Sequence, residues 1–328
     1  MRGLPRQSLA GIRCYNRAEF LESACRCFAR PHPNGHPCGA RRKKEPQSVK
    51  ERYQDIDEKN EALREYLEIY KDKQPAREFL ERFEMSWIYH DAALEGVVYT
   101  HQELMAALYP GRTSAEASMI PVVLEVRNHK AVCDFIREEA AGAKKQAQIT
   151  LTTIKRMHDL FLGNTPEALA ERARMERRER TEKELAKERE RAGLRKDMPL
   201  HRTYFHDIHQ PAKIQPALEK LVDYTASAEF REFHPIKQAA TVQHNFLQIF
   251  PFTEHSGKVG RMCSNLILLR NGYMPAVIHS IDRQRYYECF RGPAAQFRTV
   301  LMDAMENSLD NGVKYFRDLG RKYKAINN

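Results

Sequence analysis

Hydrophobic side chains recur at helical spacing along most of the chain from residue 48 onward. Side chains at this spacing share one face of an α-helix, so the pattern predicts a mostly α-helical fold. Only the stretch from Leu200 to Ile208 alternates in the manner of a strand, and there we predict one short β-hairpin. The apolar positions that carry the helical pattern are Tyr66, Leu67 and Tyr70; Phe79, Phe83 and Trp87; Ile154, Met157 and Phe161; Ile236, Ala239 and Ala240; and Val259, Met262 and Leu266.

Capping residues and prolines indicate where several of these helices begin. Thr100 and Glu103 have the spacing of a capping box, in which each side chain accepts a hydrogen bond from the other residue's backbone N–H. Pro166, which follows Thr165, and Pro235 are placed as first-turn prolines, a position where no backbone donor is needed. A helix is therefore predicted to start at each of these three places.

The segment from Glu167 to Arg191 consists mostly of Glu, Arg, Lys and Ala and has no apolar stripe. Glu and Lys or Arg side chains one turn apart support a helix that is exposed to solvent on all sides. We therefore interpret the segment as a solvated helix that ends before Gly193 and Pro199. The alternative is an arm that binds a partner protein.

The positive charge of the chain is concentrated at its start. Residues 1–45 carry ten of the basic and three of the acidic residues, which accounts for +7 of the net charge of +10. The remainder is close to neutral, so a nucleic-acid-binding core receives little support. Residues 1–45 also lack any helical or strand pattern, and we interpret them as a basic, disordered tail. A nucleic-acid or localisation role for that tail is the alternative.

Several classes of protein are excluded or disfavoured. No apolar run approaches the roughly 20 residues that a membrane-spanning helix requires, and the N-terminus has no continuous apolar segment of the secretory type. The seven cysteines are an odd number, and no second cluster completes a zinc site, so neither a disulfide scaffold nor a zinc domain is expected. We expect one or two domains, no membrane and a cytoplasmic location.

One stretch, Phe250 to Arg261, combines a sharp loop, a glycine at a helix start and two cations. The free N–H groups at a helix N-terminus attract anions, and Lys258 and Arg261 add positive charge beside Gly257. Glu254 is placed to hold a divalent metal ion that bridges phosphate oxygens. The stretch is therefore a candidate phosphate site, although it is not a Walker A loop, since no Ser or Thr follows Lys258.

Glu95 is a second candidate residue. On a helix it shares a face with Ile88 and Ala92, so its carboxylate would point toward the interior and require a cation. Arg261 is the candidate partner. The alternative is that Glu95 reaches solvent at a helix end before Gly96.

The stretch from His234 to Arg261 resembles the Fic (Fido) family, whose signature is HPFx(D/E)GNGRxxR after a helix of this kind. The stretch Asn265 to Ile278 and the motif Arg283-x-x-Tyr-Tyr287 are also similar to the family, as is the helix that contains Ile154 and His158. Leu200 to Val222 resembles the flap hairpin of the family and the helix that follows it. Residues 91–96 resemble its inhibitory helix, (S/T)xxxE(G/N), with Asp91 at the Ser/Thr position.

The resemblance implies a helical bundle with a short β-hairpin flap that binds ATP with Mg²⁺ and transfers AMP to a hydroxyl group of a target protein. It implies that Glu254 is the metal ligand and that Arg261 contacts the γ-phosphate or, in the inhibited state, pairs with the inhibitory Glu95. It does not identify the target protein, and it leaves a homo-oligomer open. By the same resemblance, the nucleotide-binding residues are Ser256, Gly257, Lys258, Gly260 and Arg261.

The chain departs from the family signature at the catalytic position. Phe250 occupies the place of the motif histidine, which serves the family as general base, and a phenyl ring cannot accept a proton. His255 and Ser256 replace the Gly-Asn pair of the loop, which adds a side chain where the backbone approaches phosphate. We therefore expect impaired catalysis with residual nucleotide binding. The alternatives are an active but autoinhibited adenylyltransferase and a non-catalytic protein-interaction module.

The chain thus divides into four predicted segments. After the tail comes an N-terminal helical region with the inhibitory-type helix near 87–96, and a C-terminal helix follows the Fido core. The charged insertion lies inside that core. The predicted bounds are 1–45 for the tail, 46–145 for the N-terminal helical region, 146–292 for the core, 165–197 for the insertion and 293–328 for the C-terminal helix.

Overall fold

The predicted tail, residues 1–45, lies outside the part of the chain that the structure describes, as does most of the predicted hairpin from Leu200 to Ile208. No strand occurs in the described residues, so the flap stays a prediction. None of the described helices is both long and apolar enough to cross a membrane. The computed structural model describes residues 48–113, 115–142, 149–178, 181–199 and 206–326.

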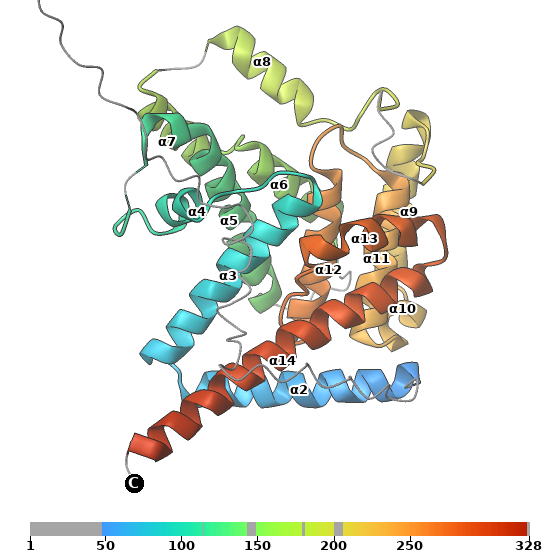
Figure 1. Ribbon diagram of the computed structural model, residues 1–328. Helices are drawn as coiled ribbons and strands as arrows, with labels where there is room; N and C mark the ends of the chain where they lie inside the picture. Colours follow the sequence, from blue (N-terminus) through green and yellow to red (C-terminus); the bar gives the residue numbers. More distant parts are fainter. Residues whose placement is uncertain (1–47, 114, 143–148, 179–180, 200–205, 327–328) are drawn as a thin grey trace, which may run out of the picture. The chain divides into compact units, whose positions relative to one another are not determined.

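The described chain is mostly helical, as the apolar spacing predicts (Figure 1). The capping box of Thr100 and Glu103 is confirmed, and helices begin at Pro166 and Pro235 as expected. The helices are α2 (Val49–Ile69), α3 (Gln74–Leu94), α4 (His101–Leu108), α5 (Ile120–Ala141), α6 (Leu151–Leu162), α7 (Pro166–Glu176), α8 (Glu182–Arg191), α9 (Ile214–Ala226), α10 (Ala228–Glu232), α11 (Pro235–Ile249), α12 (Ser256–Arg270), α13 (Arg283–Glu288) and α14 (Ala294–Ile326).

Helix α12 is the central element of the core. It packs against α11, α5 and α6, and every residue from Ser256 to Leu268 is buried. Its close approach to α11 depends on Gly260, because a Cβ atom there would lie only 3.1 Å from the ring of Phe246. Helix α11 in turn packs against α9 and α14, and α14 packs against α2. Residues 256–268 of α12 are therefore enclosed by protein.

The C-terminal end of α11 is fixed by Arg195, a buried arginine that follows α8 near the end of the charged insertion. Its Nε donates to the Phe250 carbonyl at 2.7 Å, and its backbone N–H donates to the Pro251 carbonyl at 2.9 Å. The last carbonyls of a helix have no partner within the helix and carry partial negative charge, so a cation satisfies them well. Residues 206–209 also contact this helix end, where the backbone N–H of His209 donates to the Gln248 carbonyl at 3.0 Å.

The charged insertion forms two helices where the sequence predicts one. Helix α7 ends at Arg177, which adopts a left-handed conformation with φ of 53°. Helix α8 then starts from a capping box of Thr181 and Glu184, which the charged composition of the segment does not reveal. The backbone N–H of Thr181 donates to Glu184 at 2.9 Å, and that of Glu184 donates to the Thr181 hydroxyl at 3.3 Å. A good cap can restart a helix as readily as it starts one, which explains the break.

Replacing Thr100 with Ala removes the side-chain acceptor of a half-exposed capping box, so we expect the free energy of unfolding to fall by about 1 kcal/mol. Urea unfolding measures this change. Gln102→Ala, at an exposed position on the first turn of the same helix, is the matched control and should leave the midpoint almost unchanged. Equal midpoints for the two variants would contradict a stabilising cap.

Candidate functional site

The predicted anion site lies at the first turn of α12. This turn is buried, so its free N–H groups lie inside the protein. A Cβ atom at Gly257 would stand 2.1 Å from Oε1 of Glu95, so the Glu95 carboxylate lies directly against the backbone of this turn. The absence of a side chain at Gly257 makes this approach sterically allowed. An anionic group of the protein thus already lies where a helix N-terminus attracts anions.

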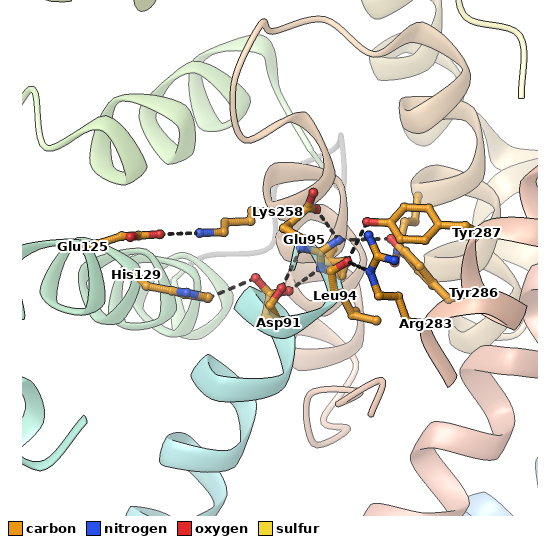
Figure 2. Close-up of polar contacts among 11 residues, drawn as sticks. Asp91, Leu94, Glu95, Glu125, His129, Lys258, Arg283, Tyr286 and Tyr287 are labelled. Carbon is orange, nitrogen blue, oxygen red and sulfur yellow. Dashed lines mark hydrogen bonds and ion pairs between the residues drawn. The ribbon is translucent and has the colours of Figure 1, made fainter. Parts of the chain in front are cut away.

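Arg261, one turn further along α12, is held by the end of α3. Its Nη1 lies 2.9 Å from Oε1 of Glu95, so the ion pair predicted from the sequence is confirmed. Its Nε donates to Oδ1 of Asp91, and its Nη2 donates to the Asp91 backbone carbonyl at 3.1 Å. Nη1 also donates to the Tyr286 hydroxyl at 3.3 Å. Figure 2 shows Asp91 and Glu95 at the end of α3, with Tyr286 to one side.

Asp91 is enclosed on its other side by α5, where Nε2 of His129 lies 3.2 Å from its Oδ2. Burial by itself would raise the pKa of Asp91, but the charge of Arg261 and the contact with His129 outweigh burial and hold that pKa below its usual range. Burial lowers the pKa of His129, although Asp91 opposes the shift. Asp91 is therefore a carboxylate and His129 a neutral imidazole at neutral pH.

Lys258 also has a partner within the protein. Its Nζ lies 3.1 Å from Oε1 of Glu125 on α5, and its side chain is 4% exposed. The ammonium group lies 5.9 Å from the centre of the Phe161 ring, on α6. Figure 2 shows the Glu125 and Lys258 pair on the opposite side of Glu95 from Tyr286. Both cations of the predicted phosphate site are thus paired with carboxylates.

Glu254, the predicted metal ligand, contacts Arg191 at the end of α8. Nε of Arg191 donates to Oε1 of Glu254 at 3.0 Å, and Nη2 contacts the other oxygen. Both side chains are substantially exposed, so the pair contributes little to stability. No cluster of three or more His, Cys, Asp or Glu side chains suited to a metal occurs among the described residues.

The loop before α12 contains two residues in the left-handed region. Phe250 has φ of 49° and a buried side chain, so it fills the core at the position where the family signature has its histidine. His255 has φ of 61°, a conformation that glycine adopts at the least cost. The Ser256 hydroxyl accepts from the Phe252 N–H at 2.8 Å and donates to the Phe252 carbonyl at 2.9 Å, which closes the loop.

His158 on α6 contacts the same loop at Phe252 and at Glu254, the predicted metal ligand. Its ring stacks on Phe252 with centroids 3.7 Å apart, and its Nε2 lies 3.1 Å from the Glu254 backbone carbonyl. Burial lowers the pKa of His158 to about 4, and burial together with the charge of Lys258 lowers the pKa of His255 to about 3. Both imidazoles are neutral at neutral pH, and His158 acts here as a structural donor.

A cavity of about 310 Å³ opens beside the loop, between α5, α6, α7 and α8. Glu254 and His255 form its wall on the loop side, and Arg172 and Arg191 face them from the charged insertion. The wall thus mixes two basic and two acidic side chains. The residues that line the cavity are Pro121, Glu125, Asn128, Phe161, Leu162, Asn164, Arg172, Arg191, Glu254 and His255.

Sequence reasoning brought Glu95 and Arg261 together but missed Asp91 as an ion-pair partner of Arg261. The spacing was available as a signal, because Asp91 and Glu95 are four residues apart and share a helix face. Two carboxylates on one buried face imply a shared cation. His129 and Glu125 on α5 were also missed, as was Arg195, which follows α8 outside any helix, and each lies far from the loop in sequence.

Comparison with known proteins identifies the domain that contains this loop. A model of the Fic/DOC family matches residues 148–268. A protein adenylyltransferase Fic of Aedes aegypti is 33% identical over 82 residues, which are 24% of this chain and 16% of the relative. That of Drosophila virilis is 22% identical over 261 residues, which are 78% of this chain and 47% of the relative. The chain thus spans less than half the length of these curated relatives.

Solved structures share the fold. Fic-1 from C. elegans superposes with a TM-score of 0.60 at 19% identity, covering 81% of this chain and 71% of that one. A Fic domain containing signaling protein from Bacteroides thetaiotaomicron superposes with a TM-score of 0.62 at 19% identity, covering 81% of this chain and 98% of that one. At this level of identity, the likeness establishes the fold alone.

Stability should decrease as the pH falls from about 6.5 to 4, because His158 is buried and neutral in the folded state with a pKa of about 4. In this window the unfolded chain binds the proton and the folded chain does not, so protonation favours unfolding by about 2 to 3 kcal/mol at the lower end. Urea unfolding at a series of pH values measures the slope. The slope should be shallower in His158→Gln and unchanged in His101→Gln, at an exposed position.

Proposed function

Residues 148–268 form a Fic/DOC family domain, and from this premise we propose that the protein is a relative of the protein adenylyltransferases in which AMP transfer is impaired. The single observation that carries the proposal is the buried N-terminus of α12, which retains a glycine and two cations around an anionic group, next to a buried phenylalanine at the base position. This arrangement supports a retained scaffold for phosphate that lacks the general base of the family signature.

The residues present fit a nucleotide phosphate chain. The Glu95 carboxylate against Gly257 is an anion on the first turn of α12, and it marks the place where a phosphate group would be bound. Lys258 and Arg261 would supply the positive charge, and Ser256 and Gly260 would shape the loop and the helix. Glu254 would hold Mg²⁺ through one carboxylate, as is common for this ion. Bound ATP would supply the AMP group, with Mg²⁺ neutralising phosphate charge.

The impairment follows from Phe250. A general base typically contributes about 10² to 10⁴ to the rate, and a phenyl ring contributes none of it. The nearest imidazole in the loop, His255, has a pKa lowered to about 3 by burial and by Lys258, so it is a weak base. It also lines the cavity toward α5 and α6 rather than replacing Phe250 in the core. The target of the proposed AMP transfer is a hydroxyl group of a protein.

A non-catalytic interaction module is the second candidate, and one observation favours it. All three charged groups of the loop are paired within the protein: Glu254 with Arg191, Lys258 with Glu125, and Arg261 with Asp91 and Glu95. A site that has become purely structural would have this property too. Titration with ATP, with and without Mg²⁺, separates the two candidates, because only a retained nucleotide site binds.

We expect no AMP transfer from labelled ATP by the unmodified protein and weak transfer by Phe250→His combined with Glu95→Gly. Adding His255→Gly, Ser256→Asn and Lys258→Arg should raise the rate further, since these changes restore the rest of the signature. The gain from the histidine should be about 10² to 10⁴ once the loop is restored. The matched control carries the same loop changes and keeps Phe250.

Robust transfer by the unmodified protein would overturn the proposed impairment. If His255→Ala then abolished that transfer, His255 would be the base. If the rates of AMP transfer are equal for the restored loop with Phe250 and for the restored loop with Phe250→His, Phe250 is not the cause of the impairment.

A further inference from the structure

The charged insertion ends at the carboxylate that the family signature assigns to a metal ion. Arg191 is the last residue of α8, and its guanidinium engages both oxygens of Glu254, Oε1 through Nε at 3.0 Å and Oε2 through Nη2. Two parallel hydrogen bonds fix the plane of the guanidinium on the carboxylate. A divalent metal ion bound by Glu254 would use the same oxygens. A cation of the protein therefore already occupies the place of the metal.

The guanidinium of Arg191 can bind a second anion without releasing Glu254. Its third nitrogen, Nη1, takes no part in the pair, and the planar group presents donors along more than one edge. The side chain is 45% exposed and lines the cavity of about 310 Å³ beside the loop. Arg191 can therefore bridge the Glu254 carboxylate and an anion in the cavity, which is how Mg²⁺ connects a carboxylate with phosphate.

A second arginine of the insertion, Arg172 on α7, lines the same cavity. Both carboxylates of the cavity wall are bound to cations, Glu254 to Arg191 and Glu125 to Lys258 at 3.1 Å. These pairs reduce the repulsion that an entering anion would meet. The cavity thus offers guanidinium groups from two helices of the insertion to an anionic ligand, and guanidinium geometry suits phosphate oxygens.

The exposed pair of Arg191 and Glu254 is weak, but its competitor is weak as well. Mg²⁺ loses its waters reluctantly and relies on phosphate oxygens as further ligands, so a single carboxylate holds it poorly before nucleotide is bound. A modest ion pair is then enough to keep the metal position filled by Arg191 in the nucleotide-free protein.

We propose that Arg191 takes the place of the divalent metal ion at Glu254, and that Arg191 and Arg172 bind the phosphate chain of a nucleotide without a metal. The insertion is then part of the binding site, where it supplies the positive charge that the family signature assigns to Mg²⁺. This inference rests on the proposed nucleotide site and deepens it.

Mn²⁺, which prefers carboxylate ligands as Mg²⁺ does, tests the metal position without nucleotide. In titrations that follow unbound Mn²⁺ by EPR, Arg191→Gln should bind Mn²⁺ at least about fivefold more tightly than the unmodified protein, because an ion pair and a like charge are removed together. Adding Glu254→Gln should cancel this gain. Lys187→Gln, at an exposed position of α8, is the matched control for net charge and should change the affinity less than about twofold. Equal affinities for Arg191→Gln and the unmodified protein would overturn the proposal.

Calorimetric titration with ATP tests the phosphate contact. The starting protein is Glu95→Gly, because the Glu95 carboxylate fills the place against Gly257. This protein should bind ATP nearly as tightly in EDTA as in Mg²⁺. Adding Arg191→Gln should weaken binding about tenfold in EDTA, and Mg²⁺ should restore most of the loss. Adding Arg172→Gln should weaken binding in both conditions, because no metal ion replaces that side chain.

The ATP titrations can contradict the proposal in two ways. A starting protein that binds ATP only with Mg²⁺ would show that Arg191 does not replace the metal, and unchanged binding in EDTA after Arg191→Gln would exclude its contact with phosphate. If ATP binds none of these proteins while Mn²⁺ binding tightens in Arg191→Gln, the nucleotide site is refuted and the occupation of the metal position by Arg191 stands.

Discussion

The buried charge of Arg261 is the constraint on which the arrangement of the site depends. Helix α12 is buried from Ser256 to Leu268, so a cation on this part of it must be neutralised by anions inside the protein. Both anions come from the end of α3. The same helix end is tied to α13, where Nε of Arg283 and the Tyr287 hydroxyl donate to the Leu94 carbonyl at 2.7 Å and 2.9 Å. The charge of one arginine thus explains why an N-terminal helix ends at the centre of a domain that begins some fifty residues later.

The ion pairs of Glu254, Lys258 and Arg261 differ in how deeply they are buried. The Arg261 and Asp91 pair is almost fully buried, the Lys258 pair joins a buried ammonium to a partly exposed carboxylate, and the Glu254 pair is exposed on both sides. Screening by water and salt weakens the exposed pair most. The side of the site that faces the cavity is consequently the more adaptable one, and the side that faces α3 is the more rigid.

Much of the fold could be predicted from the sequence, because apolar spacing and caps act locally. The starts at Thr100, Pro166 and Pro235 depend on neighbouring residues alone, and they were correct. The break at Arg177 was not predicted. A charged segment without an apolar stripe has no helical periodicity whose interruption would indicate that a second helix begins. Contacts within the site could be predicted only where a motif implied the partner residue, as for Glu95 and Arg261. The partners Glu125 and His129 could not be predicted, because periodicity tells which face of a helix is buried but not which distant helix covers that face. Arg195 lies between helices, where no periodicity indicates burial.

The anchoring of Arg195 has a consequence for any metal ion that approaches Glu254. Arg195 is fixed to the end of α11, and Arg191 precedes it by only four residues, which span at most about 14 Å when extended. Even when its ion pair opens, the backbone of Arg191 stays within this radius of the anchor and its guanidinium within one side-chain length more, so the guanidinium behaves as a tethered counter-ion at an effective concentration on the order of millimolar or above. A divalent cation from solution competes at Glu254 with a charge that cannot diffuse away, and occupancy of that carboxylate depends on where α8 lies as much as on the concentration of the metal.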